Sequence, residues 1–258
     1  PRTTNEHAAT HCARTARVDV SQYRLPVHFD PARLRADLAV ADSSAWSQHF
    51  HPRDYQGDWC GVALRSASGR VNDLHAHPVP PQHYQATPLL AHCPYFRSVL
   101  AELGLTLRGV RLLSLGPDST IRPHRDRGLA YRYGELRLHI PIITGNAVVF
   151  MVAGERVDMA SGECWYLDLD QEHSVHNAGA ERRVHLVLDG VRDARSDQLL
   201  TAAGMGPREV VAPLDESTQR QVIAELQRRD DQSSRALAAS MLASLQSCSS
   251  ISTPDSPQ

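Results

Sequence analysis

The sequence contains no lysine, so all 27 basic residues of the 258-residue chain are arginine. The planar guanidinium group of arginine favours bidentate recognition of carboxylates over diffuse positive charge. The formal net charge is only −2, which argues against a protein built to bind nucleic acid or an anionic membrane surface. The composition therefore indicates recognition of small carboxylates rather than binding to a polyanion.

The sequence also lacks paired cysteines and long hydrophobic runs. Its cysteines include no C-x-x-C pair, which is typical of reduced thiols in a cytosolic protein rather than of a disulfide framework. The first seven residues are polar and lack the apolar core of a signal peptide. The most apolar window, residues 138–154, is interrupted by Pro141, Gly145 and Asn146, so it is too broken for a membrane span. We expect a soluble, cytoplasmic protein. The five cysteines are Cys12, Cys60, Cys93, Cys164 and Cys248.

Two helices are predicted before residue 105. Asp30 and Pro31 are suited to the N-cap and the first turn of a helix. A second helix is expected to begin at Pro94 and to end at Gly104, because glycine is common just past a helix C-terminus. The apolar residues at helical spacing are Leu34 and Leu38 in the first helix, and Phe96, Val99, Leu100 and Leu103 in the second.

Two other stretches are predicted to have little regular structure. Residues 1–20 show no sustained periodicity and are expected to form a loose arm. Residues 43–92 are rich in proline, histidine, glycine and aspartate, with only short apolar runs. We expect irregular structure with a few edge strands there.

After Gly109 the hydrophobic pattern changes from a helical period to a strand period. Short apolar stretches are separated by turn residues, and no helices are interleaved between them. This pattern predicts a mainly β fold whose core, residues 105–190, is a sandwich or jelly roll. The predicted strands are 110–115, 136–143, 147–152, 155–159, 164–167 and 183–188.

Helical spacing returns after Gly190. The chain is therefore divided into a loose arm (1–20), one β domain with N-terminal helices (21–190), a C-terminal helical extension (191–246) and a disordered serine-rich tail (247–258). The apolar faces of the extension are Val222, Ile223 and Leu226, then Leu237, Met241, Leu242 and Leu245.

Three residues within the β region form a recognisable ligand set. His124 and Asp126 make an H-x-D pair, and His173 follows much later in the chain. Two imidazoles and one carboxylate are the ligands of a mononuclear non-haem iron site. Residues i and i+2 of a strand point the same way, so the pair is expected to reach one metal from one edge. Three protein ligands leave open positions, whereas a structural zinc site would have four ligands.

The strands around these residues carry a polar face. Arg183 and His185 alternate with apolar residues in one strand, and Arg137 and His139 do so in another. A polar face inside the fold makes sense only if the interior binds a charged ligand, because unpaired buried charge is costly. Arg183 lies ten positions beyond His173, so we expect it to hold an acidic co-substrate through a bidentate pair.

Several of these residues have alternative interpretations. His176 could replace His173 as a ligand, although residues three apart on a strand face opposite sides. His185 is more typical of a satisfied interior histidine than of a catalyst. Arg122, Arg125 and Arg127 fit a solvated rim, with the alternative that one of them grips a substrate carboxylate. A further histidine group has metal-like spacing but lies in a proline-rich loop without carboxylate support, which favours a loop over a metal site. That group is His75, His77 and His83.

The motifs, joined in this order, resemble those of the aspartyl/asparaginyl β-hydroxylase family of Fe(II)/2-oxoglutarate oxygenases. This grouping is also similar to bacterial proline hydroxylases that act on the free amino acid. The carboxylate at Asp126 favours the small bacterial enzymes over the animal members, which lack it. The resemblance covers residues 105–190, and its motifs are IRPHRD (121–126), RLHIP (137–141), GECWYLD (162–168), EHSVHN (172–177) and RVHLVLD (183–189).

The resemblance implies a double-stranded β-helix of the cupin-like jelly-roll type, with flanking N- and C-terminal helices. It implies that Arg183 anchors 2-oxoglutarate and that Arg137 and His139 assist. The expected reaction uses Fe(II), 2-oxoglutarate and O2, hydroxylates an sp³ carbon of an aspartate-, asparagine- or proline-like residue, free or within a peptide, and releases succinate and CO2. The metal ligands implied are His124, Asp126 and His173.

The remaining arginines indicate what the substrate carries. One arginine is assigned to 2-oxoglutarate, so the others leave an excess of positive charge around the site of a protein with little net charge. Such an excess usually matches an anionic ligand. We therefore expect a carboxylate-bearing amino acid or peptide. The candidate substrate residues are Arg122, Arg125, His185 and His176.

Two other functions are compatible with a cupin-like fold. A metal-binding sensor would bind iron without consuming 2-oxoglutarate and would give Arg183 no role. A non-oxidative cupin enzyme, such as a sugar isomerase, commonly uses an H-x-H pair with a glutamate, which this region lacks.

Overall fold

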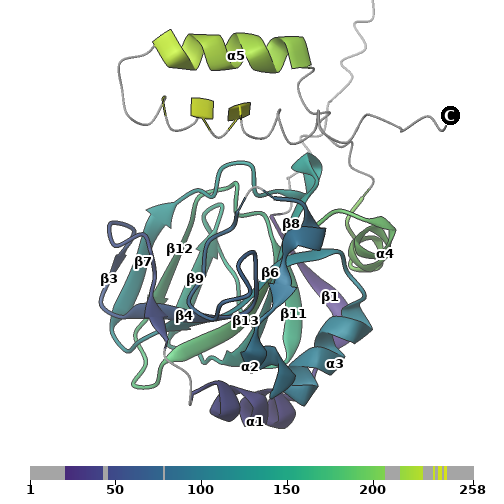
Figure 1. The fold of residues 1–258 in the computed structure, drawn as a ribbon. Coiled ribbons are helices and arrows are strands. Elements are labelled where there is room, and N and C mark those ends of the chain that lie inside the picture. Colours follow the sequence, from purple (N-terminus) through teal and green to yellow (C-terminus); the bar gives the residue numbers. More distant parts are fainter. Residues whose placement is uncertain are drawn as a thin grey trace, which may run out of the picture.

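The computed structural model describes residues 21–42, 46–77, 79–206 and 216–228, and residues 235, 238, 239, 241 and 242. The predicted arm (1–20) and tail (247–258) lie outside the described residues, as do Leu237 and Leu245 of the second predicted C-terminal helical face. The described chain forms two antiparallel β-sheets that face each other, with helices outside them (Figure 1).

The larger sheet has eight strands. Its order is β1 (Gln22–His28), β11 (Glu163–Leu167), β8 (Glu135–Ile143), β13 (Arg183–Val191), β6 (Leu107–Leu115), β4 (Trp59–Ser66) and β2 (Ser47–Gln48), with β5 (Gln85–Ala86) paired to β4. The smaller sheet has the order β10 (Glu155–Arg156), β9 (Val148–Val152), β12 (His173–Asn177), β7 (Ser119–His124) and β3 (Tyr55–Gln56).

The chain passes from one sheet to the other as it proceeds from β6 to β13. Strands β6, β8, β11 and β13 belong to the larger sheet, and β7, β9, β10 and β12 belong to the smaller one. This alternation between two facing antiparallel sheets is the topology of a jelly roll. The prediction of a mainly β, double-stranded β-helix core is confirmed.

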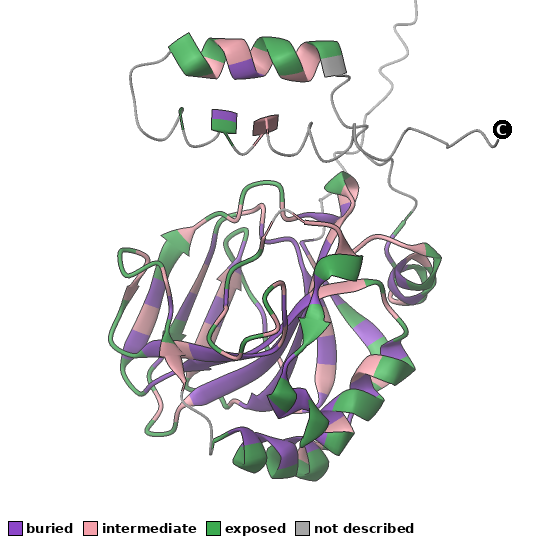
Figure 2. Cartoon of the chain, viewed as in Figure 1, coloured by how far each residue is buried: buried purple, intermediate pink, exposed green. Residues whose placement is uncertain are grey.

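The outer face of the larger sheet is covered by helices. Helix α1 (Pro31–Ala41) contacts α3 (Pro94–Leu103) and strand β8, and α2 (Pro88–Ala91) contacts β4. The apolar residues that alternate with Arg137 and Arg183 belong to this core cluster, which explains why the polar positions face inward. Buried residues follow the strands and the inner sides of the helices (Figure 2). The alternating residues are Leu136, Leu138, Ile140, Ile142, Val184, Leu186 and Leu188.

Both predicted N-terminal helices are present where expected. Asp30 caps α1, since its side chain accepts hydrogen bonds from Ala32 N at 2.8 Å and Arg33 N at 3.3 Å. Helix α3 ends at Gly104, whose φ of 62° is left-handed and suits glycine. Beyond the sheets lie α4 (Ala194–Ala202) and α5 (Glu216–Arg228).

The prediction for residues 43–92 was wrong in one respect. Strand β4 is not at an edge, because it pairs with β6 on one side and with β2 and β5 on the other. Residues 61–64 are all buried and show no alternation, which is the pattern of a strand covered on both faces. The predicted strand at 155–159 is also shorter than expected, since β10 ends at Arg156.

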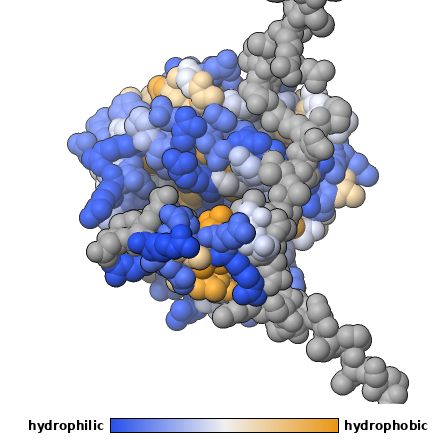
Figure 3. Space-filling model, turned by 90° about the horizontal axis from the view of Figure 1, so that it is seen from above, coloured by the Kyte–Doolittle hydropathy of each residue, from blue (hydrophilic) through white to orange (hydrophobic). Residues whose placement is uncertain are grey.

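The described surface is mostly hydrophilic in the view from above, apart from a small hydrophobic area (Figure 3). Among the described residues, the exposed large hydrophobic side chains are Val40 and Tyr133. No described helix is long and apolar enough to cross a membrane. Within the described chain Cys60, Cys93 and Cys164 are free thiols, as predicted for these three.

We expect Gly162→Ala to destabilise the fold strongly. Gly162 has a φ of 85°, and an added Cβ would lie 2.1 Å from the backbone oxygen of Phe29. Positive φ in a non-glycine residue costs roughly 1–3 kcal/mol, and overpacking costs a similar amount. Thermal unfolding should therefore show a loss of at least about 2 kcal/mol. Gly145→Ala is the control, because no atom lies within 4 Å of its added Cβ, and it should change stability by less than about 0.5 kcal/mol.

Candidate active site

A cavity of about 640 Å³ lies between the two sheets. This volume is within the range of roughly 300–1,000 Å³ that is usual for small-molecule sites. Its wall combines the predicted ligand set, buried arginines and a group of aromatic rings. The lining residues used below are His49, Phe50, Trp59, His75, Arg111, His124, Arg125, Asp126, Arg127, Arg137, His139, Phe150, His173 and Arg183.

The three predicted metal ligands come together on the smaller sheet. His124 is the last residue of β7, His173 is the first residue of β12, and the two face each other in the ladder. Ligand atoms of these histidines and of Asp126 all lie within 4.8 Å of one another. Asp126 lies just past the end of β7 rather than on the strand, and its backbone N–H donates to Leu169 O at 2.9 Å.

Backbone carbonyl groups fix the orientation of both imidazole rings. Nδ1 of His124 lies 2.8 Å from Arg122 O, and Nδ1 of His173 lies 3.1 Å from Gln171 O. Because a carbonyl oxygen only accepts, each Nδ1 carries the proton and each Nε2 keeps its lone pair for a metal. Burial lowers the pKa of His173 to about 4, so this ring is neutral at physiological pH.

Asp126 is held as a carboxylate by an arginine. Its Oδ2 accepts a hydrogen bond from Arg137 at 2.7 Å, while Oδ1 lies 3.8 Å from Nε2 of His124. Burial opposes the ionised form, but the neighbouring Arg137 guanidinium favours it, and the net effect is a lowered pKa of Asp126. Two imidazoles and one carboxylate on one side of an open cavity fit a divalent iron ion with free coordination positions.

Arg183 is a buried cation without a carboxylate partner among the described residues. Its side chain is 2% exposed, its Nε has no hydrogen-bond partner, and burial lowers its pKa to about 9. One amino group lies 2.7 Å from Nδ1 of His185, which is neutral because burial lowers its pKa well below the usual value. A buried guanidinium that lines a cavity and lacks a counterion fits an anionic ligand.

The structure places the other predicted residues in different surroundings. His139 lines the cavity and is neutral, since burial and then Arg183 lower its pKa well below the usual value. Arg125 and Arg127 are exposed residues that line the cavity. Arg137 is not free for a co-substrate, because it binds both Asp126 and Asp189.

Three predicted substrate residues do not line this cavity. Arg122 is exposed and donates to Arg53 O at 2.6 Å. His176 is exposed and lies 2.8 Å from the Thr120 hydroxyl, so residues 173 and 176 do face opposite sides of β12. His185 is buried beside Arg183, but its Nε2 has no hydrogen-bond partner among the described residues, so it is not the satisfied interior histidine that was predicted. It borders a separate pocket with Phe150 rather than this cavity.

Sequence reasoning missed one buried arginine and an aromatic wall. Arg111 shares the inward face of β6 with Leu113, and apolar residues occupy both faces of this strand, so no alternation marked Arg111 in the sequence. The rings of Trp59, His49, Phe50 and His75 stack with successive centroid distances of 3.4, 4.4 and 4.1 Å. No periodicity marks His49 and Phe50, which lie in an irregular segment after β2.

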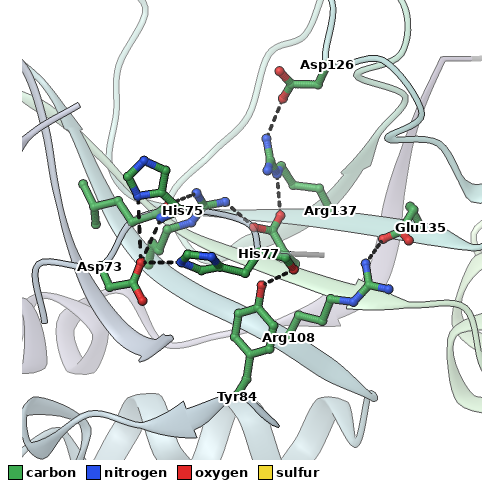
Figure 4. Close-up of polar contacts among 11 residues, drawn as sticks. Asp73, His75, His77, Tyr84, Arg108, Asp126, Glu135 and Arg137 are labelled. Carbon is green, nitrogen blue, oxygen red and sulfur yellow. Dashed lines mark hydrogen bonds and ion pairs between the residues drawn. The ribbon is translucent and has the colours of Figure 1, made fainter. Parts of the chain in front are cut away.

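The early histidine group differs from its prediction. His75 and His77 do come together with a carboxylate, that of Asp73, and His83 is not part of this cluster. The Asp73 carboxylate already accepts hydrogen bonds from Ser68 N and Ser68 Oγ. It also accepts one from the backbone of His75 and lies 3.0 Å from Nε2 of His77 (Figure 4). These bonds organise the loop without requiring a metal ion.

The fold and the site define an oxygenase-type jelly roll, and comparison with known proteins identifies its family. The Aspartyl/Asparaginyl beta-hydroxylase family matches residues 28–193, which is more than half of the chain. The chain belongs to this family, and it is therefore an enzyme of the hydroxylase class.

Two curated relatives are similar to this chain. L-proline cis-4-hydroxylase of Rhizobium meliloti (strain 1021) is 28% identical over 205 residues, which cover 74% of this chain and 69% of the relative. L-proline cis-3-hydroxylase 2 of Streptomyces sp is 24% identical over 176 residues, which cover 67% of this chain and 60% of that relative. A solved 2OG-Fe(II) oxygenase family structure from Burkholderia pseudomallei has a TM-score of 0.48 at 17% identity, covering 68% of this chain and 87% of that one.

Proposed function

We propose that this chain is an Fe(II)- and 2-oxoglutarate-dependent dioxygenase that hydroxylates an sp³ carbon of a small free amino acid. The observation that carries the proposal is that His124, Asp126 and His173 converge in the same cavity as the buried Arg183, which has no carboxylate partner among the described residues. A sensor would have no use for that arginine. The resemblance to two L-proline hydroxylases makes proline the first substrate to test.

His124, Asp126 and His173 would hold the iron. When bound, iron supplies the oxidation chemistry, in which 2-oxoglutarate is decarboxylated to succinate and CO2 and one oxygen atom is placed on the substrate carbon. The protein's residues need no nucleophile or general base for this reaction. The histidine rings would provide Nε2 ligand atoms, since their Nδ1 atoms contact backbone carbonyl groups, and Asp126 would provide the negative charge.

Arg183 would bind the distal carboxylate of 2-oxoglutarate. Its guanidinium is positioned by Nδ1 of His185 at 2.7 Å, and it lies 5.5 Å from the ring centre of Phe150. A carboxylate there would form a charge-assisted pair in poorly solvated surroundings, where such pairs are strong. The neutral His139 and His185 add no competing charge to this part of the cavity.

The aromatic wall and the remaining cations indicate the substrate class. The stacked side chains of Trp59, His49 and Phe50 line the cavity, and His49 is neutral because burial lowers its pKa to about 3. Such a wall fits an apolar side chain or a saturated ring. Arg125 and Arg127 at the exposed edge of the cavity would attract a carboxylate. A small amino acid with an apolar side chain has both features.

We expect the enzyme to prefer a free carboxylate over an amide. With proline as substrate, prolinamide should show a kcat/KM about 10–100-fold lower, because a hydrogen bond to a charged group contributes roughly 1.5–3 kcal/mol. The rate of succinate formation under saturating 2-oxoglutarate measures this ratio. A preference for the amide would contradict the assignment of a carboxylate-bearing substrate.

The function itself is tested by screening free amino acids for substrate-stimulated succinate formation with iron-loaded protein. Stoichiometric succinate and hydroxylated product are expected from at least one of them. Iron binding without 2-oxoglutarate consumption for any amino acid or peptide would favour the sensor.

A further inference from the structure

Four charged side chains form a connected series of ion pairs, and three of them, Arg111, Arg137 and Asp126, line the cavity. Arg111 donates to Asp189, and Asp189 also accepts from Arg137. Arg137 in turn donates to Asp126 (Figure 4). The Nε of Arg137 lies 2.5 Å from Asp189 Oδ1, and its amino group lies 2.7 Å from Asp126 Oδ2. The series begins at the backbone oxygen of Leu74, which accepts from Arg111 at 2.7 Å.

The register of the larger sheet sets the position of Asp189. Strand β13 lies between β6 and β8, and Asp189 is directly opposite Arg137 in the ladder with β8. Arg111 reaches it from β6 on the other side. Asp189 is 6% exposed and Arg111 is 5% exposed, so both are withdrawn from bulk water. Each oxygen of Asp189 accepts a hydrogen bond from one guanidinium group.

We propose that Asp189 is a positioning residue for the metal ligand Asp126, acting through Arg137. This inference rests on the proposed function, since it assigns a role toward the iron site. Asp189 engages the Nε edge of Arg137 and leaves one amino group for a single hydrogen bond to Asp126 Oδ2. The other carboxylate oxygen of Asp126, Oδ1, is the one that lies toward His124. Asp189 thus keeps one oxygen of Asp126 available for a metal.

Removal of the Asp189 charge would change how Arg137 shares its hydrogen bonds between Asp189 and Asp126. In this series of ion pairs, the charges of two carboxylates and two guanidinium groups balance. Without Asp189, Arg137 is free to turn both of its amino groups toward Asp126 in a bidentate pair, which is the preferred geometry of arginine with a carboxylate. Both oxygens of Asp126 would then be occupied, and a metal ion would have to compete with Arg137 for them.

The test is the affinity of the metal-free protein for Co(II), titrated anaerobically by visible absorption. In Asp189→Asn we expect the dissociation constant to rise about 10–100-fold, the range seen when an outer partner of a metal ligand is lost. The Co(II) absorption bands should also change, because they report the coordination geometry. Glu135→Gln is the matched control, since Glu135 lies on the same strand as Arg137 but pairs with Arg108 at 2.6 Å. This control should bind Co(II) as the unaltered protein does.

The outcomes separate a positioning role from a structural one. If Asp189→Asn is folded, has a lower melting temperature and binds Co(II) with unchanged affinity and spectrum, the ion pair is structural and the proposal is wrong. If that variant does not fold, Arg137→Lys decides, because one ammonium group keeps the charge but cannot hold both carboxylates. Unchanged Co(II) affinity in Arg137→Lys would likewise overturn the proposal. Failure of the unaltered protein to bind Co(II) would instead contradict the proposed function.

Discussion

Replacement of His173 with alanine is expected to remove Fe(II) binding and hydroxylation together. The change deletes one of three ligands, so the affinity should fall by more than the roughly 10–100-fold that loss of an outer partner costs. His173 makes one side-chain hydrogen bond, to Gln171 O at 3.1 Å, so the fold should survive its loss. Anaerobic Fe(II) titration, succinate formation and circular dichroism of the same preparation measure the three effects.

His176→Ala is the matched control for this prediction. His176 lies on the same strand, three residues further on, but it is exposed and bonds to Thr120 on the surface. We expect its Fe(II) affinity and turnover to be close to those of the unaltered protein. If His176→Ala abolished iron binding while His173→Ala retained it, the ligand assignment would be wrong, and His176 would be the ligand in place of His173.

The core strands of this fold could be predicted because their sequences alternate. In β8 and β13 every second residue is apolar and packs under the helices, so the intervening arginines and histidines had to face inward. Strand β4 could not be recognised in the same way. Residues 61–64 are buried on both faces, and a short continuous apolar run has no period that distinguishes a central strand from irregular structure.

The sequence predicted which residues line the site better than it predicted which of them form ion pairs with one another. The H-x-D pair and the distant histidine do converge, although Asp126 lies beyond the strand end. The partner of Arg137 was not predictable, because it depends on the register of β8 with β13. That register places Asp189 opposite Arg137 and neutralises a cation expected to serve the co-substrate. The excess of positive charge in the cavity is therefore smaller than the sequence indicates, and it is concentrated at Arg183 and the exposed arginines.

Arg183→Ala is expected to weaken 2-oxoglutarate binding by roughly 2–5 kcal/mol, the cost of removing one partner of a buried charge pair. This corresponds to about 30-fold to several thousand-fold in the dissociation constant. Iron binding should remain nearly unchanged, because Arg183 lies outside the ligand set. The two affinities must be measured separately. A general loss of structure would weaken the binding of both iron and 2-oxoglutarate, whereas loss of the anchor would weaken only the binding of 2-oxoglutarate. Isothermal titration of the Fe(II)-loaded protein with 2-oxoglutarate in the absence of O2 gives the dissociation constant of 2-oxoglutarate. Titration with Fe(II) gives the dissociation constant of the metal.

Arg182→Ala provides a control with a neighbouring arginine. Arg182 pairs with Asp42 on the outside of the molecule and does not line the cavity, so its removal should leave 2-oxoglutarate affinity unchanged. The unaltered protein contains Arg183 as a buried cation without a carboxylate partner among the described residues, and a bound anion would offset the cost of burying this charge. Arg183→Ala should therefore lose most of the stabilisation against heat that 2-oxoglutarate confers on the Fe(II)-loaded protein. If 2-oxoglutarate bound Arg183→Ala as tightly as the unaltered protein, another residue would be the anchor and the metal-binding sensor would become the better explanation of the cavity.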